Sequence, residues 1–259
     1  MARVRPGEAA NPAPPTVQRV RVRFAKRGRL RFLSHRDVAR SFERAVRRAG
    51  VPVAHSHGFS PHPRLSWIGA APTGTASEAE YVEIGLTRPV DPDALVAALD
   101  AALPDGLDVL AAAVAEGAPL AERIEASSWV VELPGVEPTA LRSALSELLA
   151  RESVVVERVT PSGRRMIDVR GALVRADVRD LAVEGAAPSS GPSPIPPDRA
   201  GVCAILTAVV RQTTPAVRPD DVLGALDVVA GLRPPSPPRA TRTAQGLLDH
   251  QGDLADPLG

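Results

Sequence analysis

The chain has 259 residues, of which 44% are hydrophobic and 24% charged, a balance typical of a globular protein and not of a fibre or a peptide. Its single cysteine, Cys203, excludes a disulfide framework and a cysteine-ligated zinc or iron–sulfur centre. No apolar run approaches the roughly 20 residues that a membrane helix needs. We therefore expect a cytoplasmic protein without a membrane partner, beginning with a disordered tail over residues 1–16.

The net charge of +1 is distributed unevenly along the chain. Between Val17 and Gly50, twelve Lys or Arg residues stand against only two acidic residues, Asp37 and Glu43. The remainder of the chain is net acidic. The sequence thus combines a strongly basic beginning with an acidic body.

The first predicted element is a strand over 17–25, where valines and Phe24 alternate with arginines. A period of two with β-branched residues predicts a half-buried strand with one basic face. After a turn at 26–28 the alternation resumes, so we expect the basic face to continue across the turn to Arg29 and Arg31.

A helix is predicted from Ser34 to Gly50. Ser34 and Asp37 form a carboxylate variant of the capping box, and Gly50 suits a left-handed cap. At 100° per residue the apolar side chains fall on one arc, whereas His35 lies in the first turn. The opposite arc carries a row of guanidiniums, from Arg36, Arg40, Arg44, Arg47 and Arg48.

The following elements complete a β-α-β-β-α-β order, which is the split βαβ arrangement of a ferredoxin-like unit. A long loop from His55 leads into a strand at 81–86, followed by a helix from Asp91 and a strand over 107–115. The second half repeats the plan. Its strands are expected at 128–133, 154–159, 164–178 and 203–210, and its helices at 137–151 and 220–229.

We therefore predict an α+β fold with two tandem ferredoxin-like lobes. The basic lobe spans 17–126 and the second lobe spans 127–232. A Pro/Ser-rich stretch at 184–200 is expected to be a flexible insertion in the second lobe, because it is too polar and too rich in proline to pack. An extended tail is expected over 233–259.

The long loop holds three of the five histidines. His55, His57 and His62 could hold a metal if the loop folded around it, since imidazole is a common ligand. They lack the helical pairing and the cysteine partners that make such spacings specific. Histidines that bond the loop backbone or contact phosphate are the favoured interpretation.

Two X-Pro steps stiffen the same loop within GFSPHPRLSW. Arg64 would then project near Phe59 and His62, and a rigid, basic and aromatic loop suits a phosphate or a nucleobase. The alternative is a proline-rich crossover whose aromatic side chains fill the core. Both interpretations stay open at the level of sequence.

Three carboxylates lie close to these basic residues in sequence: Asp37, Glu78 and Glu80. Paired acids can act as general acid and base. Such acids are more often solvated or paired with neighbouring arginines.

Three motifs together resemble the radical SAM-linked protein family, a domain of unknown function that occurs fused to radical SAM enzymes or as a separate chain. They read VRVRFAKRGRLRFLSHRDVARSFERAVRRAG, SHGFSPHPRLSW and SEAEYVEIGL. The resemblance implies a place near radical SAM chemistry or RNA metabolism and no established reaction. With one cysteine this chain lacks the three-cysteine cluster motif, so it would be the partner of such an enzyme or a substrate-presenting module.

The predicted function is an RNA-binding accessory protein in tRNA or rRNA modification or processing, with RNA and a radical SAM protein as partners and with neither cofactor nor metal. One alternative is a nucleotide- or RNA-modifying enzyme that uses Asp37, Glu78 or Glu80 as acid or base. Another is an interaction module that docks an acidic partner. The residues expected to contact phosphate or base are Arg29, Arg31, His35, Arg36, Arg40, Phe59, Ser60, His62 and Arg64.

Overall fold

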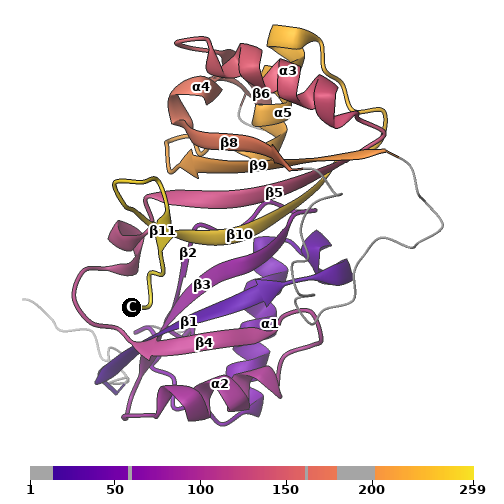
Figure 1. Cartoon of the computed structure of the whole chain (residues 1–259). Coiled ribbons are helices and arrows are strands. Elements are labelled where there is room, and N and C mark those ends of the chain that lie inside the picture. Colours follow the sequence, from indigo (N-terminus) through magenta and orange to yellow (C-terminus); the bar gives the residue numbers. More distant parts are fainter. Residues whose placement is uncertain (1–13, 58–59, 161–162, 180–201) are drawn as a thin grey trace, which may run out of the picture. The chain divides into compact units, whose positions relative to one another are not determined.

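The computed structural model describes residues 14–57, 60–160, 163–179 and 202–259 (Figure 1). The chain forms two compact units. Unit 1 comprises residues 1–123 and 258–259, and unit 2 comprises residues 124–257. Each unit combines helices with antiparallel strands, which confirms the predicted α+β class. No helix in the described part of the chain is long and apolar enough to cross a membrane.

The described residues of unit 1 form four antiparallel strands. The central strands β1 and β3 pair with each other, β4 pairs with β1, and β2 pairs with β3, so the order is β4-β1-β3-β2. The elements are β1 (Gln18–Lys26), η1 (Gly28–Phe32), α1 (His35–Arg48), β2 (Leu65–Ile68), β3 (Ala76–Leu86), α2 (Pro92–Asp100), β4 (Val109–Val114) and η2 (Leu120–Arg123).

The helices α1 and α2 supply the apolar side chains that cover one face of this sheet. The rings of Phe24, Phe42 and Trp67 lie at the centre of the contact, with centroid distances of 4.6 Å for Phe24–Phe42 and 5.2 Å for Phe42–Trp67. Because side chains alternate along a strand, the neighbours of these core residues face the other side of the sheet. The core also includes Val20, Val22, Val38, Val46, Val82, Ile84, Leu86, Leu95 and Leu99.

The capped helix is confirmed. Ser34 Oγ accepts a hydrogen bond from the backbone N–H of Asp37 at 3.3 Å and donates one to the Asp37 carboxylate at 2.6 Å. Gly50 follows the helix with a φ of +62°. The buried side of α1 holds the predicted apolar residues, and its other side carries the predicted arginines.

The basic face does not continue across the turn after β1, contrary to the prediction. The segment Gly28–Phe32 is a 3-10 helix, in which the backbone N–H of Leu30 bonds to the carbonyl of Arg27 at 3.0 Å. Gly28 has a φ of +54°, which ends the extended strand. Four alternating residues were too short a signal to distinguish a strand from this turn.

The part of unit 2 that the structure describes also has a four-stranded antiparallel arrangement. Strand β5 pairs with β10 and β9, and β9 pairs with β8, so the order is β10-β5-β9-β8. The strands are β5 (Ala126–Pro134), β8 (Leu173–Arg179), β9 (Cys203–Arg211) and β10 (Arg239–Leu248), with β11 (Leu254–Ala255) on β10 and a separate hairpin of β6 (Val155–Thr160) and β7 (Gly163–Asp168).

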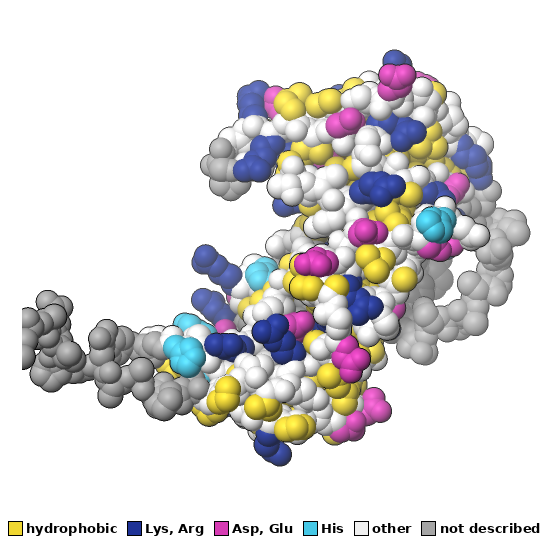
Figure 2. All heavy atoms as spheres, turned by 90° about the vertical axis from the view of Figure 1, so that its left-hand side faces the viewer, with side chains coloured by type: hydrophobic (Ala, Val, Ile, Leu, Met, Phe, Trp, Pro, Cys, Tyr) yellow, Lys and Arg dark blue, Asp and Glu magenta, His cyan; other side chains and the backbone are white. Residues whose placement is uncertain are grey.

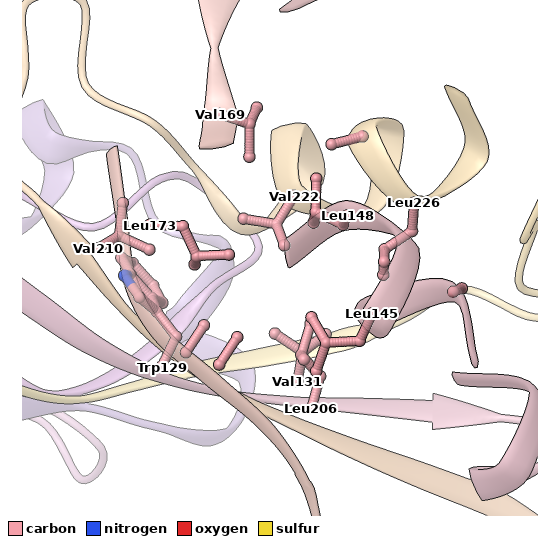
Figure 3. Close-up of a cluster of buried hydrophobic side chains, with 14 of the residues drawn as sticks. Trp129, Val131, Leu145, Leu148, Val169, Leu173, Leu206, Val210, Val222 and Leu226 are labelled. Atoms are coloured by element: carbon pink, nitrogen blue, oxygen red, sulfur yellow. The ribbon is translucent and has the colours of Figure 1, made fainter. Parts of the chain in front are cut away.

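The core of unit 2 lies between its sheet and two helices. Side chains of β5 and β9 point toward side chains of α3 (Pro138–Leu149) and α5 (Pro219–Ala230), as Figure 3 shows. A short helix, α4 (Val169–Ala172), adds to the same cluster. The labelled core residues are Trp129, Val131, Leu145, Leu148, Val169, Leu173, Leu206, Val210, Val222 and Leu226.

Two predictions for unit 2 differ from the structure. The stretch 164–178 is not one strand, because the Asp168 carboxylate accepts hydrogen bonds from the backbone N–H groups of Gly171 and Val154 and starts α4. The segment after Leu232 is not only an extended tail, because 239–248 pairs with β5 along its length. The predicted insertion at 184–200 lies outside the described residues.

The buried and exposed phenylalanines of unit 1 allow a matched test of this packing. We expect Phe42→Ala to lower the free energy of unfolding of unit 1 by about 3–5 kcal/mol, because it removes a fully buried ring. Phe32→Ala should change it by less than about 0.5 kcal/mol, since that ring is 59% exposed. Urea unfolding followed by Trp67 fluorescence in a Trp129→Phe background measures both values. Equal losses for the two variants would contradict the assigned core.

Candidate functional site

Seven of the nine predicted phosphate- and RNA-contacting residues fall into two groups on different sides of unit 1. The first group lies on η1 and the first turns of α1. We call it the basic ridge, and it consists of Arg29, Arg31, Phe32, His35, Arg36 and Arg40. The second group lies beside the sheet face opposite α1 and α2. We call it the sheet pocket, and its lining is Thr16, Arg19, Ser56, His62, Pro63, Arg64, Leu65, Ser66, Glu83 and Gly85.

The basic ridge presents an aromatic ring among cations. Phe32 is 59% exposed, and the Arg31 guanidinium carbon lies 4.8 Å from its ring centroid. The backbone carbonyl of Arg31 accepts a hydrogen bond from Gly74 at 2.8 Å, which ties η1 to the loop before β3. The turn therefore holds the ring and the guanidinium together at the surface.

The beginning of α1 contributes the rest of the ridge. His35 is exposed at the first helical position, and its ring meets the Trp67 ring edge-on with a centroid distance of 5.4 Å. Arg36 and Arg40 are exposed as well. Since unsatisfied N–H groups give a helix N-terminus partial positive charge, this end of α1 adds to the attraction for anions.

Asp37 is committed to the helix cap. The hydrogen bond from Ser34 is the main reason that the pKa of Asp37 is lowered, and Arg40, 3.7 Å away, adds to the effect. A lowered pKa weakens a carboxylate as a proton acceptor. The contacts of Asp37 are thus those of a capping residue.

Glu78 and Glu80 are also held in contacts within unit 1. Glu78 pairs with Arg27, whose Nε lies 2.7 Å from its carboxylate, and Arg27 also binds Asp108 at 2.8 Å. These bonds raise the pKa of Arg27. Glu80 is buried and accepts a hydrogen bond from the backbone N–H of Ala71 at 3.1 Å. Both carboxylates stabilise the surroundings of β3 in the structure.

The histidines of the long loop do not gather around a common point. His55 forms an isolated antiparallel β-bridge with Pro63. The backbone N–H of His62 donates a hydrogen bond to Ser56 Oγ, the His62 carbonyl accepts one from the Ser56 N–H, and His62 lines the sheet pocket. Within the described ranges, no group of three or more His, Cys, Asp or Glu side chains could hold a metal ion. Phe59, predicted to lie near a base, is outside those ranges, and Ser60 is exposed.

The sheet pocket has a volume of about 270 Å³. Gly85 of β3 forms its floor, opposite Arg19 of β1, and donates a backbone hydrogen bond to the carbonyl of Arg64 at 3.0 Å. Leu65 and Trp67 face the core, so Arg64 and Ser66 face the pocket side. The two predicted residues His62 and Arg64 therefore belong to this site and not to the ridge.

The pocket keeps an excess of positive charge despite one carboxylate. Glu83 lies 3.5 Å from Arg19 and 3.6 Å from Arg21. Arg21 is almost fully buried and also donates to the carbonyl of Ala118. Arg19 and Arg64 remain exposed. Figure 2 shows Lys and Arg side chains beside His side chains on one face of the molecule, with acidic groups interspersed.

Sequence reasoning did not identify three features of these sites. It did not place Phe32 at the surface, it assigned no role to Glu83, and it overlooked Gly85. The available signal for Gly85 was its position inside a predicted strand, where glycine often marks a close approach of backbone or ligand.

The contact between Ser34 and Asp37 predicts a change in titration. In the intact protein the pKa of Asp37 lies below the usual range, so the ionised carboxylate adds stability above the ordinary aspartate pKa and this stability is lost as pH falls through the lowered value. Ser34→Ala should move the pKa of Asp37 upward, and Arg40→Ala should move it less. Carbon-detected NMR titration of the Asp37 carboxyl group checks this. A larger shift in Arg40→Ala would contradict the assignment.

The match of this sequence to a known protein family covers both candidate sites almost completely. Residues 19–219 match the family described as uncharacterized proteins conserved in bacteria, DUF2344. That description names no reaction and no radical SAM partner. None of the curated proteins matches the sequence. Because the match spans most of unit 1 and much of unit 2, the chain belongs to the bacterial DUF2344 family.

Proposed function

We propose that the protein binds RNA through the basic ridge and acts as an accessory protein in the modification or processing of transfer or ribosomal RNA. The observation that carries this proposal is the exposed Phe32 ring with the Arg31 guanidinium stacked over it. An exposed aromatic ring among arginines matches the chemistry of RNA recognition. Guanidiniums contact phosphates, and an aromatic ring stacks on an unpaired base.

The arginines of the ridge are available for such contacts. Within the described residues, Arg29 and Arg36 are exposed and form no ion pair, while Arg40 is only loosely paired with Asp37 at 3.7 Å. Each phosphate that these side chains contact releases condensed counterions, so binding would be strong at low salt and weaken as salt rises. Stacking on Phe32 would supply a contribution that salt affects little.

We further propose that both units are ferredoxin-like lobes. The element order of unit 1 and its strand order β4-β1-β3-β2 support this, as does the matching order β10-β5-β9-β8 in unit 2. In unit 2 the β6–β7 hairpin and α4 are additions between α3 and β8. A fold of this kind hosts many functions, so the proposed RNA binding depends on the ridge and not on the fold.

The single cysteine and the contacts of the three carboxylates support the accessory role. A single cysteine cannot form the cluster of a radical SAM enzyme, so the residues of this sequence would not hold that centre themselves, and the resemblance to radical SAM-linked proteins favours a radical SAM enzyme as partner. The alternative of an enzyme using Asp37, Glu78 or Glu80 is less favoured. Each of these carboxylates is held in capping, ion-pair or backbone contacts.

Substitutions at the two ends of α1 test the proposed RNA surface. Arg36→Ala should weaken binding to total cellular RNA and reduce the slope of log K against log salt concentration by about 0.7–0.9. Arg47→Ala is the matched control, because Arg47 is exposed at the far end of the same helix. Filter binding across a salt series measures both. Equal effects of the two substitutions would contradict a localised RNA surface.

The exposed ring gives a second prediction. Phe32→Ala should weaken RNA binding by about 5- to 100-fold while leaving the salt slope unchanged, because stacking carries no counterion release.

The alternative function, docking of an acidic protein partner, predicts a different result. A protein should then co-purify with the chain even after nuclease treatment, and Arg36→Ala should abolish this co-purification. That result, with no RNA affinity at low salt, would overturn the proposed function.

A further inference from the structure

We infer that the sheet pocket is a second anion site, which binds a terminal phosphate group, that is, a phosphate monoester. Such a group is carried by a free nucleotide and by the 5′ end of an RNA. The second of these sources rests on the proposed RNA binding, whereas the first does not. The pocket and the basic ridge lie on different sides of unit 1, so each can be tested without the other.

Two arginines flank Gly85, a position of the sheet that carries no side chain. We call the space above it the gap. Arg19 stands directly opposite Gly85 in the register of β1 and β3. On the other side of Gly85, Arg64 continues the register of β2, because Leu65 pairs with Ile84. Neighbouring strands are about 4.8 Å apart, so the two arginine backbones are separated by about 10 Å, and Gly85 places no side chain of its own between them. Two guanidiniums on such arms can converge on one phosphate.

Gly85 is required to keep this gap open. A Cβ atom at this position would lie 3.2 Å from both Oγ1 and Cγ2 of Thr16 and 3.3 Å from the Cβ of Arg64. Thr16 is held over the strand by its neighbour, since the backbone N–H of Val17 bonds to the carbonyl of Leu86 at 2.8 Å. Glycine inside a strand weakens it, so its presence here fits a site of close approach.

Hydroxyl groups around the gap can complete the coordination of a phosphate. Thr16 Oγ1 is buried and has no hydrogen-bond partner among the described residues. Ser56 Oγ accepts a bond from the backbone of His62 at 3.0 Å, which leaves its own proton to donate. A monoester offers three terminal oxygens to these donors and a diester only two. A buried hydroxyl without a partner is costly unless a ligand satisfies it.

The charge of the lining suits an anion of this size. In the lining, the two guanidiniums of Arg19 and Arg64 stand against the one carboxylate of Glu83. Glu83 also pairs with Arg21, which is buried outside the lining. The volume of about 270 Å³ lies below the ~300–1,000 Å³ of sites for drug-sized ligands. The pocket therefore suits a phosphate with its adjoining sugar, and the rest of the ligand would extend into solvent.

Titration calorimetry of the full chain with adenosine 5′-monophosphate and with adenosine tests the site. We expect binding of the monophosphate and none of the nucleoside. Arg64→Gln should weaken binding at least about tenfold, as loss of a charge-assisted hydrogen bond does. Arg88→Gln, an exposed arginine of unit 1 outside the pocket, is the charge-matched control and should bind as the unchanged protein does. Gly85→Ala should also weaken binding, by narrowing the gap.

Two RNA 12-mers, with a 5′-phosphate or a 5′-hydroxyl, distinguish the two sources. A preference for the 5′-phosphate that disappears in Arg64→Gln identifies the RNA end as ligand. Binding of the monophosphate without such a preference identifies a free nucleotide. Equal binding of both 12-mers together with no binding of the monophosphate would overturn the site, even if Phe32→Ala still weakened both 12-mers. Conversely, monophosphate binding with no effect of Phe32→Ala on either 12-mer would support phosphate binding in the sheet pocket and contradict RNA binding by the basic ridge.

Discussion

The contact of Phe24, Phe42 and Trp67 determines how unit 1 presents its charged residues. The ring centroids lie 4.6–6.0 Å from one another, and they join α1 to β1 and β2 on one face of the sheet. Because Trp67 points into this core, the alternation of β2 turns Arg64 and Ser66 to the opposite face. Trp67 also meets His35 at the start of α1. One apolar cluster thus positions both the ridge and the pocket.

The fold divides the basic segment into structural and available cations. Arg21 and Lys26 are buried, and the Lys26 ammonium donates to the carbonyls of Ala71 and Pro72 at 3.3 Å. Arg27 is engaged by Glu78 and Asp108. Burying a charge is costly unless it is paired or hydrogen-bonded, and these residues meet that condition. In contrast, five arginines of the ridge and the pocket are exposed and can meet an anionic ligand, namely Arg29, Arg36, Arg40, Arg19 and Arg64.

The sequence predicted many of the residues of the candidate site, but it did not predict where most of them lie in the fold. The row of arginines on α1 followed from a period of 3.6, and the cap at Ser34 from a local hydrogen bond, so both predictions were correct. The sequence also singled out His62 and Arg64. It could not show that these two residues face away from α1, nor that Glu78 and Glu80 are held by Arg27 and Ala71. Those contacts join segments that are far apart in the chain or depend on a loop conformation.

The sequence by itself determined the α+β class, the amphipathic helix and the position of most strands, because hydrophobic periodicity and capping are local properties. Only the tertiary structure decided that 28–32 is a 3-10 turn with Phe32 exposed, and that 239–248 is a strand. The second of these depends on β5 as a pairing partner, since a strand with few apolar residues is stabilised by its neighbour's hydrogen bonds. The pocket at Gly85 is likewise a tertiary feature, because strand pairing brings Arg19 and Arg64 to the two sides of Gly85 and Thr16 lies against it.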